Sequence, residues 1–240
     1  MKTMLVLSMG ALLLAGTLSA QTPVPEWQAG VDKMKSLIQT NPAQASEEVG
    51  ELLKGKNKKN VDLVTSVAHV YLDAGKLTEA QEYLAMAKKA NNKDPKVSVL
   101  EGDIALAQKN IGQACQLYEQ AIYFDPNCKE AYLKYAQAYK SASPALAIEK
   151  LEQLKAVDPN CLEADRELAE VYYSSNRFGK AAEMYAKFID TPLATEDDML
   201  KYAFALFLNH DFEKSLQVAQ KGLQKNARHA AFNRLVMYNN

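Results

Sequence analysis

Five segments of this 240-residue chain repeat one pattern with a period of about 34 residues. Small residues recur at intervals of 34, 34, 33 and 34, at Ala68, Gly102, Ala136, Ala169 and Ala203. A second column of small residues keeps step with the first, at Ala80, Ala114, Ala147, Ala181 and Ser215. Several columns with one shared period predict an array of equivalent units, each of which buries its apolar face against its neighbours.

The repeated pattern resembles that of the tetratricopeptide repeat family, whose unit is a helix–turn–helix of about 34 residues. The resemblance is carried by a small–x–x–aromatic step in the first helix, an Ala–x–x–x–Tyr step in the second and a closing Pro. The segment 95–128 matches best after its first helix, with Ala114, Tyr118, Ala121 and Pro126 in place. The resemblance implies an all-α fold, a right-handed superhelical solenoid of antiparallel helix pairs.

The period also predicts the organisation of the chain. Residues 21–60 are expected to form a helix pair that acts as a degenerate or capping repeat. Five tetratricopeptide-like units are expected over 61–228, with boundaries at 61–94, 95–128, 129–161, 162–195 and 196–228. Residues 229–240 are expected to form a helix, which is either the first helix of a further repeat or a C-terminal cap.

The N-terminal segment 1–20 has the pattern of a signal peptide. Lys2 precedes an almost wholly apolar run, and Leu18-Ser19-Ala20 offers a small-residue cleavage site before Gln21. The run is shorter than the ~20 residues of a membrane-spanning helix. We therefore expect cleavage after Ala20, export to the periplasm or outside the cell, and no membrane span in the mature chain.

The sequence also indicates how some helices end. Gly75 and Asn176 are expected to take the left-handed conformation that closes a helix C-terminus. Thr78 followed by Gln81 is expected to form a capping box at the start of the next helix.

Composition argues against several functional classes. The formal net charge is −1, from 28 basic and 29 acidic residues, so the basic stripe that nucleic acid requires is missing. No phosphate loop, Cys–x–x–Cys pair or nucleophile elbow occurs, and His69, His210 and His229 lack ligand spacing. We therefore expect no enzyme activity, no metal site and no cofactor.

The three cysteines and the single basic cluster both have simple structural interpretations. Cys128 and Cys161 occupy equivalent positions of successive units, which is too far apart for a disulfide. With Cys115 they are expected to be packing residues, although the sequence leaves their redox state open. The basic run 54–60 is interpreted as a solvated loop.

The repeat predicts a concave groove, which is lined by the first helix of each unit and is the expected binding surface. The positions one step beyond the small columns are expected to point there, and they are Thr65, His69, Val99, Asp103, Leu133, Gln137, Lys140, Arg166, Glu170, Tyr173, Leu200, Phe204 and Phe207. The Lys and Asn that clamp a peptide carboxylate in adaptors of the family are absent from these positions. Instead the groove changes from polar to aromatic along the chain. Its aromatic end is interpreted either as a partner site or as core between units. Trp27, the single Trp, is expected to lie outside the groove.

Together these features predict a non-catalytic scaffold of the cell envelope that binds a protein or peptide partner through its groove. Two alternatives remain open. One is a self-associating structural module. The other is an N-terminal accessory module of a longer envelope protein whose functional part lies beyond residue 240.

Overall fold

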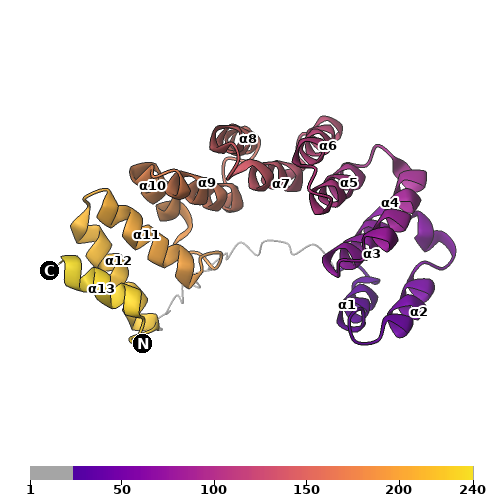
Figure 1. Cartoon of the computed structure of the whole chain (residues 1–240), viewed down its shortest axis with the longest axis horizontal. Coiled ribbons are helices and arrows are strands. Elements are labelled where there is room, and N and C mark those ends of the chain that lie inside the picture. The colour runs from indigo at the N-terminus through magenta and orange to yellow at the C-terminus, as the bar shows by residue number, and fades with distance from the viewer. Residues whose placement is uncertain (1–23, 240) are drawn as a thin grey trace, which may run out of the picture.

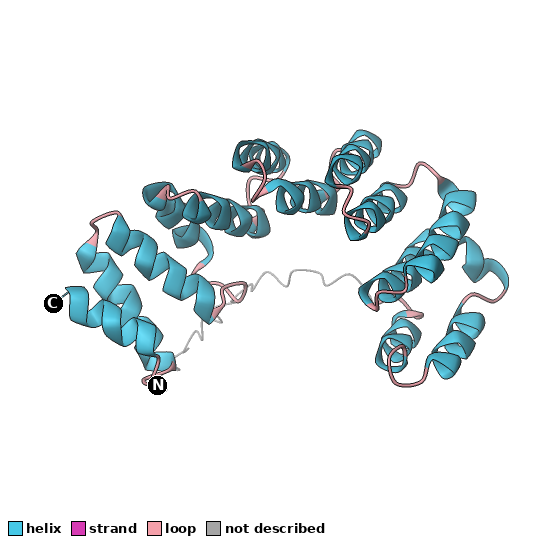
Figure 2. Cartoon of the chain, in the orientation of Figure 1, coloured by secondary structure: helices cyan, strands magenta, loops and turns pink. Residues whose placement is uncertain are grey.

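The structure, a computed structural model, describes residues 24–239, so the predicted signal peptide lies outside the described part of the chain. Within it there are thirteen α-helices, one 3₁₀ helix and no strand (Figure 2). Their bounds are α1 Gln28–Leu37, α2 Pro42–Leu52, η1 Gly55–Lys59, α3 Val61–Asp73, α4 Leu77–Asn91, α5 Pro95–Ala107, α6 Ile111–Phe124, α7 Lys129–Tyr139, α8 Pro144–Val157, α9 Leu162–Ser174, α10 Phe178–Phe188, α11 Glu196–Leu208, α12 Phe212–Lys225 and α13 Ala230–Asn239. None of the helices in this range is both long and apolar enough to cross a membrane.

The helices form a curved array in which α1 packs against α2 and α3, and from α3 onward each helix packs against its neighbours in sequence (Figure 1). α3 packs against α4, α5 against α6, and α9 against α10, so that each pair makes one unit. Every helix pair from α3–α4 to α11–α12 lies within one of the five segments that the period defines. The predicted all-α solenoid of antiparallel helix pairs is confirmed.

The small columns are the places where the two helices of a unit approach each other. Ala80, Ala114, Ala147 and Ala181 of the second column are fully buried. At Gly102, in the first column, an added Cβ would lie 2.5 Å from the Tyr118 ring, well inside van der Waals contact. The columns are therefore small because larger residues there would push the paired helices apart.

Four of the five units close their first helix in the same way. Gly75, Lys109, Asn176 and His210 have φ values of +75, +64, +57 and +63°. The next residue then donates its N–H to a carbonyl five residues back, as Lys76 does to Tyr71 at 2.9 Å. The left-handed residues predicted at Gly75 and Asn176 are confirmed. The capping box predicted at Thr78 is wrong, because α4 already begins at Leu77.

The two ends of the array are covered by helices outside the five units. Val31 and Met34 of α1 are buried in one core cluster with α3 and α4. At the other end, α13 buries Phe232 and Leu235 against α11 and α12. A Cβ at Gly222 would lie 2.5 Å from the Phe232 ring, so this Gly lets α13 pack closely on α12.

All three cysteines are free thiols. Cys115 and Cys161 are buried, and Cys128 is half-buried. Burial raises the pKa of the Cys115 thiol to about 11, so that it is protonated near neutral pH. Their role as packing residues agrees with the sequence interpretation.

Candidate functional site

The candidate site is the concave side of the array, along which the first helices of the units follow one another (Figure 1). α3 contacts α5, α5 contacts α7, and α7 contacts α9. Residues three or four apart share a helix face, so the second, sixth and ninth positions of each unit form one stripe. We call these positions the inner stripe; its members are Asp62, Ser66, His69, Lys96, Leu100, Asp103, Glu130, Lys134, Gln137, Glu163, Glu167, Glu170, Asp197, Lys201 and Phe204.

Asp103 is the centre of the first polar network on this face. Its carboxylate lies 3.1 Å from His69 Nε2 of α3 and accepts hydrogen bonds from Tyr118 OH at 2.7 Å and Lys134 Nζ at 3.0 Å. The Asp103 side chain is only 8% exposed, and an unpaired carboxylate so placed would be costly. Burial acts to raise the pKa of Asp103, but the bonds from His69 and Tyr118 and the Lys134 charge outweigh it and lower the pKa. The network therefore joins helices of three successive units around an ionised carboxylate.

A second network repeats the first one two units further along the chain. Tyr185 OH donates to Glu170 Oε1 at 2.8 Å, and Lys201 Nζ lies 2.9 Å from Glu170 Oε2. Tyr185 and Lys201 occupy the same positions relative to Glu170 as Tyr118 and Lys134 do relative to Asp103. Lys201 also pairs with Asp197, one turn earlier on α11, at 2.8 Å. Burial and the neighbouring carboxylate both raise the pKa of Tyr185, so it remains a donor.

Two further contacts link successive first helices along the groove. The Gln137 amide, which is exposed, donates to Glu167 Oε1 at 2.8 Å. Arg166 pairs with both oxygens of Asp198 at 3.2 and 3.0 Å, a bidentate arrangement that fixes the guanidinium. Asp198 completes a capping box with Thr195 at the start of α11. The polar side chains of this face are thus held by one another.

Thr65 and Val99 are less exposed than the sequence analysis expected. They are 4% and 1% exposed, and the Thr65 hydroxyl donates to the Val61 carbonyl within its own helix. Each follows the second position of its unit by three residues and precedes the sixth by one, so it lies at the edge of the inner stripe and not on it. The prediction that the Val99 side chain is available to a partner is therefore wrong, whereas Thr65, although 4% exposed, borders a hollow on this face.

The remaining predicted residues vary in exposure. Leu133 and Leu200 are half-buried and pack against core clusters, and Lys140 is half-buried at the end of α7. Tyr173 makes an edge contact with Phe178, with ring centroids 5.8 Å apart.

The aromatic end of the groove is partly covered by the C-terminal helices. Phe204 and Phe207 pack against the cluster that contains Phe232 and Leu235. The Phe207 ring lies 5.4 Å from that of Phe212 and 6.3 Å from that of Tyr238. Of the two interpretations that the sequence left open, this packing favours core between helices for Phe204 and Phe207.

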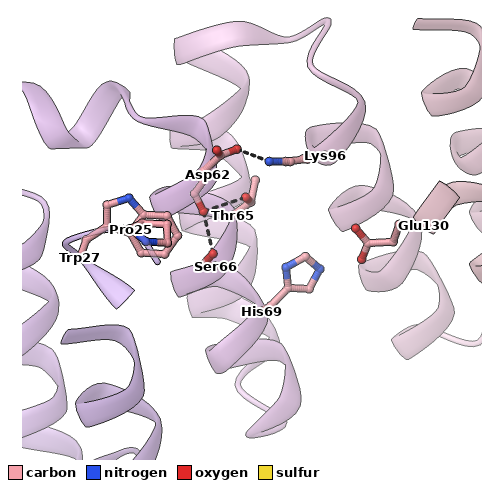
Figure 3. A pocket seen from close by; sticks show the side chains of 8 residues that line it. All are labelled: Pro25, Trp27, Asp62, Thr65, Ser66, His69, Lys96 and Glu130. Atoms are coloured by element: carbon pink, nitrogen blue, oxygen red, sulfur yellow. Dashed lines mark hydrogen bonds and ion pairs between the residues drawn. The ribbon is translucent and has the colours of Figure 1, made fainter. Parts of the chain in front are cut away.

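A hollow of about 360 Å³ opens at the N-terminal end of the same face (Figure 3). We call it the Trp27 hollow; it is lined by Pro25, Trp27, Asp62, Thr65, Ser66, His69, Lys96 and Glu130. In Figure 3, Pro25 and Trp27 lie on one side of α3, and Lys96 and Glu130 lie on the other. The expectation that Trp27 lies outside the groove is therefore wrong, because the segment before α1 brings it beside α3.

Sequence reasoning missed several residues that shape this face. They are Trp27, Lys96, Tyr118, Glu130, Lys134, Tyr185 and Lys201. The two-unit spacing of Lys134 and Lys201, and of Tyr118 and Tyr185, was the available signal. For Trp27 the period gives no signal, since this residue precedes the repeats.

The sequence profile of the tetratricopeptide repeat family matches residues 68–131 and 137–194, which together make about half of the chain. The chain belongs to the tetratricopeptide repeat family. Proteins of this family are typically non-catalytic scaffolds for protein interactions. Comparison with curated protein sequences gives no match.

Solved structures of other tetratricopeptide repeat proteins share the fold. PilW, described as a widely conserved type IV pilus biogenesis factor, superposes with a TM-score of 0.66 at 17% identity, over 88% of this chain and 97% of PilW. The pilF protein of Pseudomonas aeruginosa gives a TM-score of 0.63 at 16% identity, over 88% and 96% of the two chains. YrrB, described as a tetratricopeptide repeat protein with an unusual peptide-binding site, gives a TM-score of 0.56 at 14% identity, over 77% of this chain and 95% of YrrB.

Proposed function

We propose that this chain is an exported, non-catalytic scaffold of the cell envelope that binds a protein or peptide segment along its concave face. The observation that carries the proposal is the fixed polar array on that face. Lys134 and Lys201 are held by Asp103 and Glu170, yet they remain 35% and 29% exposed. Groups already fixed in one geometry lose little entropy on binding, which favours recognition of an extended segment.

The pairing of the polar groups also supports a scaffold rather than an enzyme. The carboxylates of Asp103, Glu170 and Asp198 are each neutralised by a neighbouring Lys or Arg. A general base or nucleophile needs a side chain free to exchange a proton with substrate. YrrB, described as having a peptide-binding site, supports peptide recognition as a use of the same fold.

Export is proposed from the sequence of the N-terminal segment 1–20. Lys2, the apolar run and the Leu18-Ser19-Ala20 step fit a secretory signal that is removed before Gln21. Cell fractionation together with the mass of the purified chain would test this step. A chain that remained in the cytoplasm with Lys2 retained would contradict it.

The test of groove binding compares two matched variants. Gln137 of α7 is exposed on the concave side, and Gln153 of α8 is exposed in the outer helix of the same unit. Each donates a hydrogen bond to a Glu, so Gln137→Arg and Gln153→Arg make the same chemical change on opposite sides. The chain from Gln21 onward, and both variants, would be immobilised and exposed to envelope extract. Each retained protein would then be purified and titrated calorimetrically.

We expect Gln137→Arg to lower the affinity for a retained partner by about tenfold, since a bulky charge in a packed interface costs about 1.4 kcal/mol or more of binding free energy. Gln153→Arg should leave the affinity unchanged. A partner that both variants bind as tightly as the parent does would place the interface outside the groove.

Self-association is a second candidate, favoured by the C-terminal end of the array. Leu208, Phe212, Met237 and Tyr238 are all exposed there, which is a cluster of apolar side chains in contact with solvent. Sedimentation velocity at increasing concentration would detect a dimer. A constant monomer mass that Phe212→Ser does not alter would exclude it.

A further inference from the structure

The basic run 54–60, which the sequence analysis interpreted as a solvated loop, has a fixed backbone. Most of it forms η1, which packs against α3 and α4. The Asn57 amide donates to the Leu52 carbonyl at 2.9 Å, and the Asn60 side chain accepts a hydrogen bond from the Leu63 N–H at the start of α3. The lysines of η1 are therefore carried by a backbone that is held against the array.

Lysines from α4 join those of η1 around one shallow hollow. The hollow has a volume of about 180 Å³, and it is lined by Lys58, Lys59, Met86, Lys89 and Ala90. Lys56 precedes Lys59 by one turn of the 3₁₀ helix, and Lys93 follows Lys89 by four residues, just past the end of α4. All the lysines of this group are exposed. We call them the basic patch; its members are Lys56, Lys58, Lys59, Lys89 and Lys93.

The basic patch is not neutralised by ion pairs. Lys54 pairs with Glu51 at 2.5 Å and Lys88 with Glu101 at 2.6 Å, but neither lysine belongs to the patch. Within residues 24–239, no carboxylate forms an ion pair with any of the five lysines of the patch. Their ammonium groups are therefore charged, exposed and unpaired in this part of the chain.

Nearby carboxylates do not cancel this charge. Glu82 lies one turn before Met86 on α4. Asp94 follows Lys93 in the sequence, and as the N-cap of α5 it accepts a hydrogen bond from the Lys96 N–H at 3.0 Å. When both carboxylates are counted against the five lysines, a surplus of three positive charges remains. The whole chain, in contrast, has a formal net charge of −1.

The basic patch lies on the outer side of the array. α4 is the second helix of its unit, and the second helices α6 and α8 lie outside the first helices α5 and α7 in Figure 1. The concave face is built by the first helices. A surface that contacts the patch would therefore leave the concave face open.

We infer that the basic patch docks the chain onto an anionic phospholipid bilayer. The inference goes beyond the proposed function, because it concerns the outer side of the array and not the groove. Each Lys close to an anionic bilayer raises the affinity about fivefold, so several of them together give stable binding. Met86 and Ala90 are half-buried at the hollow, and with the aliphatic stems of the lysines they supply an apolar surface between the charges.

The chemistry of the patch favours a fluid surface over a defined protein segment. All five cations are Lys, and no Arg occurs in the sequence before Arg166. Carboxylates of a protein partner are recognised most specifically by the planar fork of Arg. Lys is a compact charge on a flexible stem, and here no group of residues 24–239 holds it in one geometry. Such ammonium groups can follow headgroup phosphates that move within a bilayer.

Vesicle co-sedimentation tests the inference. Vesicles of one part phosphatidylglycerol to two parts phosphatidylcholine are compared with vesicles of phosphatidylcholine alone. The chain from Gln21 onward is used, because the apolar run of the N-terminal segment would itself bind lipid and because α1 to α13 all lie after that point. We expect saturable binding to the anionic vesicles, none to the neutral vesicles, and loss of binding as salt is raised to about 0.5 M.

Two variants with the same change of charge locate the site. The patch variant carries Lys58→Gln, Lys59→Gln and Lys89→Gln. The control variant changes three other exposed lysines that form no ion pair within residues 24–239, and it carries Lys35→Gln, Lys109→Gln and Lys225→Gln. The patch variant should lose about a hundredfold in affinity for the anionic vesicles, whereas the control variant should bind like the parent. Equal helicity by circular dichroism would verify that both variants are folded.

Three outcomes would overturn the inference. They are no binding of the parent to the anionic vesicles, equal binding to the neutral vesicles, and equal affinity of the patch and control variants. An acidic protein segment is the other occupant to test, with a fluorescein-labelled hexaglutamate peptide as the probe. A parent that binds this peptide but not the vesicles, with loss of peptide binding in the patch variant, would assign the patch to an acidic partner and overturn docking on a bilayer.

The failure of this inference differs from the failure of the proposed function. Gln137→Arg changes the concave side and should leave vesicle binding unchanged. A partner sensitive to Gln137→Arg, without any vesicle binding, would retain the groove and overturn the docking surface. Vesicle binding that only the patch variant loses, without any such partner, would do the reverse.

Discussion

Asp103 and Glu170 lie two units apart and occupy the same place in two copies of one network. Each carboxylate accepts a hydrogen bond from a Tyr fifteen residues later and pairs with a Lys thirty-one residues later. The repeat that matters for the polar groups is therefore two units long, although the small columns repeat in every unit. The first and third units hold Leu84 and Leu151 where the second and fourth hold Tyr118 and Tyr185.

The equivalence of the networks predicts the effect of removing each tyrosine hydroxyl. Tyr118→Phe and Tyr185→Phe should each lower the free energy of unfolding, by about 1–2 kcal/mol, because each removes a bond to an ionised acceptor. The loss should be larger for Tyr118, since Asp103 is 8% exposed and Glu170 is 25% exposed. Urea unfolding followed by circular dichroism measures both. Tyr123→Phe, at an 82% exposed position, is the control and should change nothing. Equal losses in all three variants would show that the networks contribute no stability.

The pKa of Asp103 predicts a pH dependence of stability. The pKa is lowered in the folded state, so ionised Asp103 stabilises the fold above its ordinary pKa near 3.8. This contribution is lost as the pH falls through the lower, folded-state value. Asp103→Asn should therefore cost about 2 kcal/mol at pH 7, and the difference from the parent should shrink below pH 4. Thermal unfolding of both proteins between pH 7 and pH 3 gives this difference. A gap that stays constant over that range would contradict the role assigned to the carboxylate.

The left-handed position at the end of the first helices predicts opposite effects at two sites. Lys109 has a φ of +64° and a Cβ, so Lys109→Gly should raise the free energy of unfolding by about 0.5–1 kcal/mol. Gly75→Ala should lower it by about 1 kcal/mol, although an added Cβ there meets no atom within 4 Å. Chemical denaturation of the two variants measures both changes. Changes of the same sign would show that backbone conformation does not decide stability at this position.

The sequence predicts the place of a residue well when that residue belongs to one of the columns that repeat with the 34-residue period. The buried Ala80, Ala114 and Ala147 follow from the period alone, as does the pairing of helices. Gly75 and Asn176 are residue types that favour the left-handed conformation, so the sequence predicts it there. Lys109 and His210 adopt the same conformation although their residue types do not favour it. There the hydrogen bonds of the turn decide the conformation, and these depend on the helix pair rather than on one residue.

The candidate site is less predictable because a helix rotates by about 100° per residue. A shift of one residue turns much of a side chain from the groove toward the neighbouring helix, which is why Val99 is buried. Thr65 is also buried, although it borders the Trp27 hollow beside Ser66. Trp27 escapes prediction for a different reason. It precedes the repeats, so its position beside α3 is set by how the chain enters α1 and not by a periodic pattern.

The cysteines give the last prediction, which concerns their reactivity. The thiolate is the reactive form, and burial raises the pKa of all three thiols, to about 11 for Cys115. At pH 8 the native protein should therefore react slowly with a thiol reagent such as Ellman's reagent. Cys128 should react first, because it is half-buried while Cys115 and Cys161 are buried. Unfolding in guanidinium should then release three fast-reacting thiols, which is the full cysteine content of the chain. A purified protein that yields fewer than three after unfolding would contain an oxidised cysteine, and a mass equal to that of two chains without reductant would show a disulfide between them.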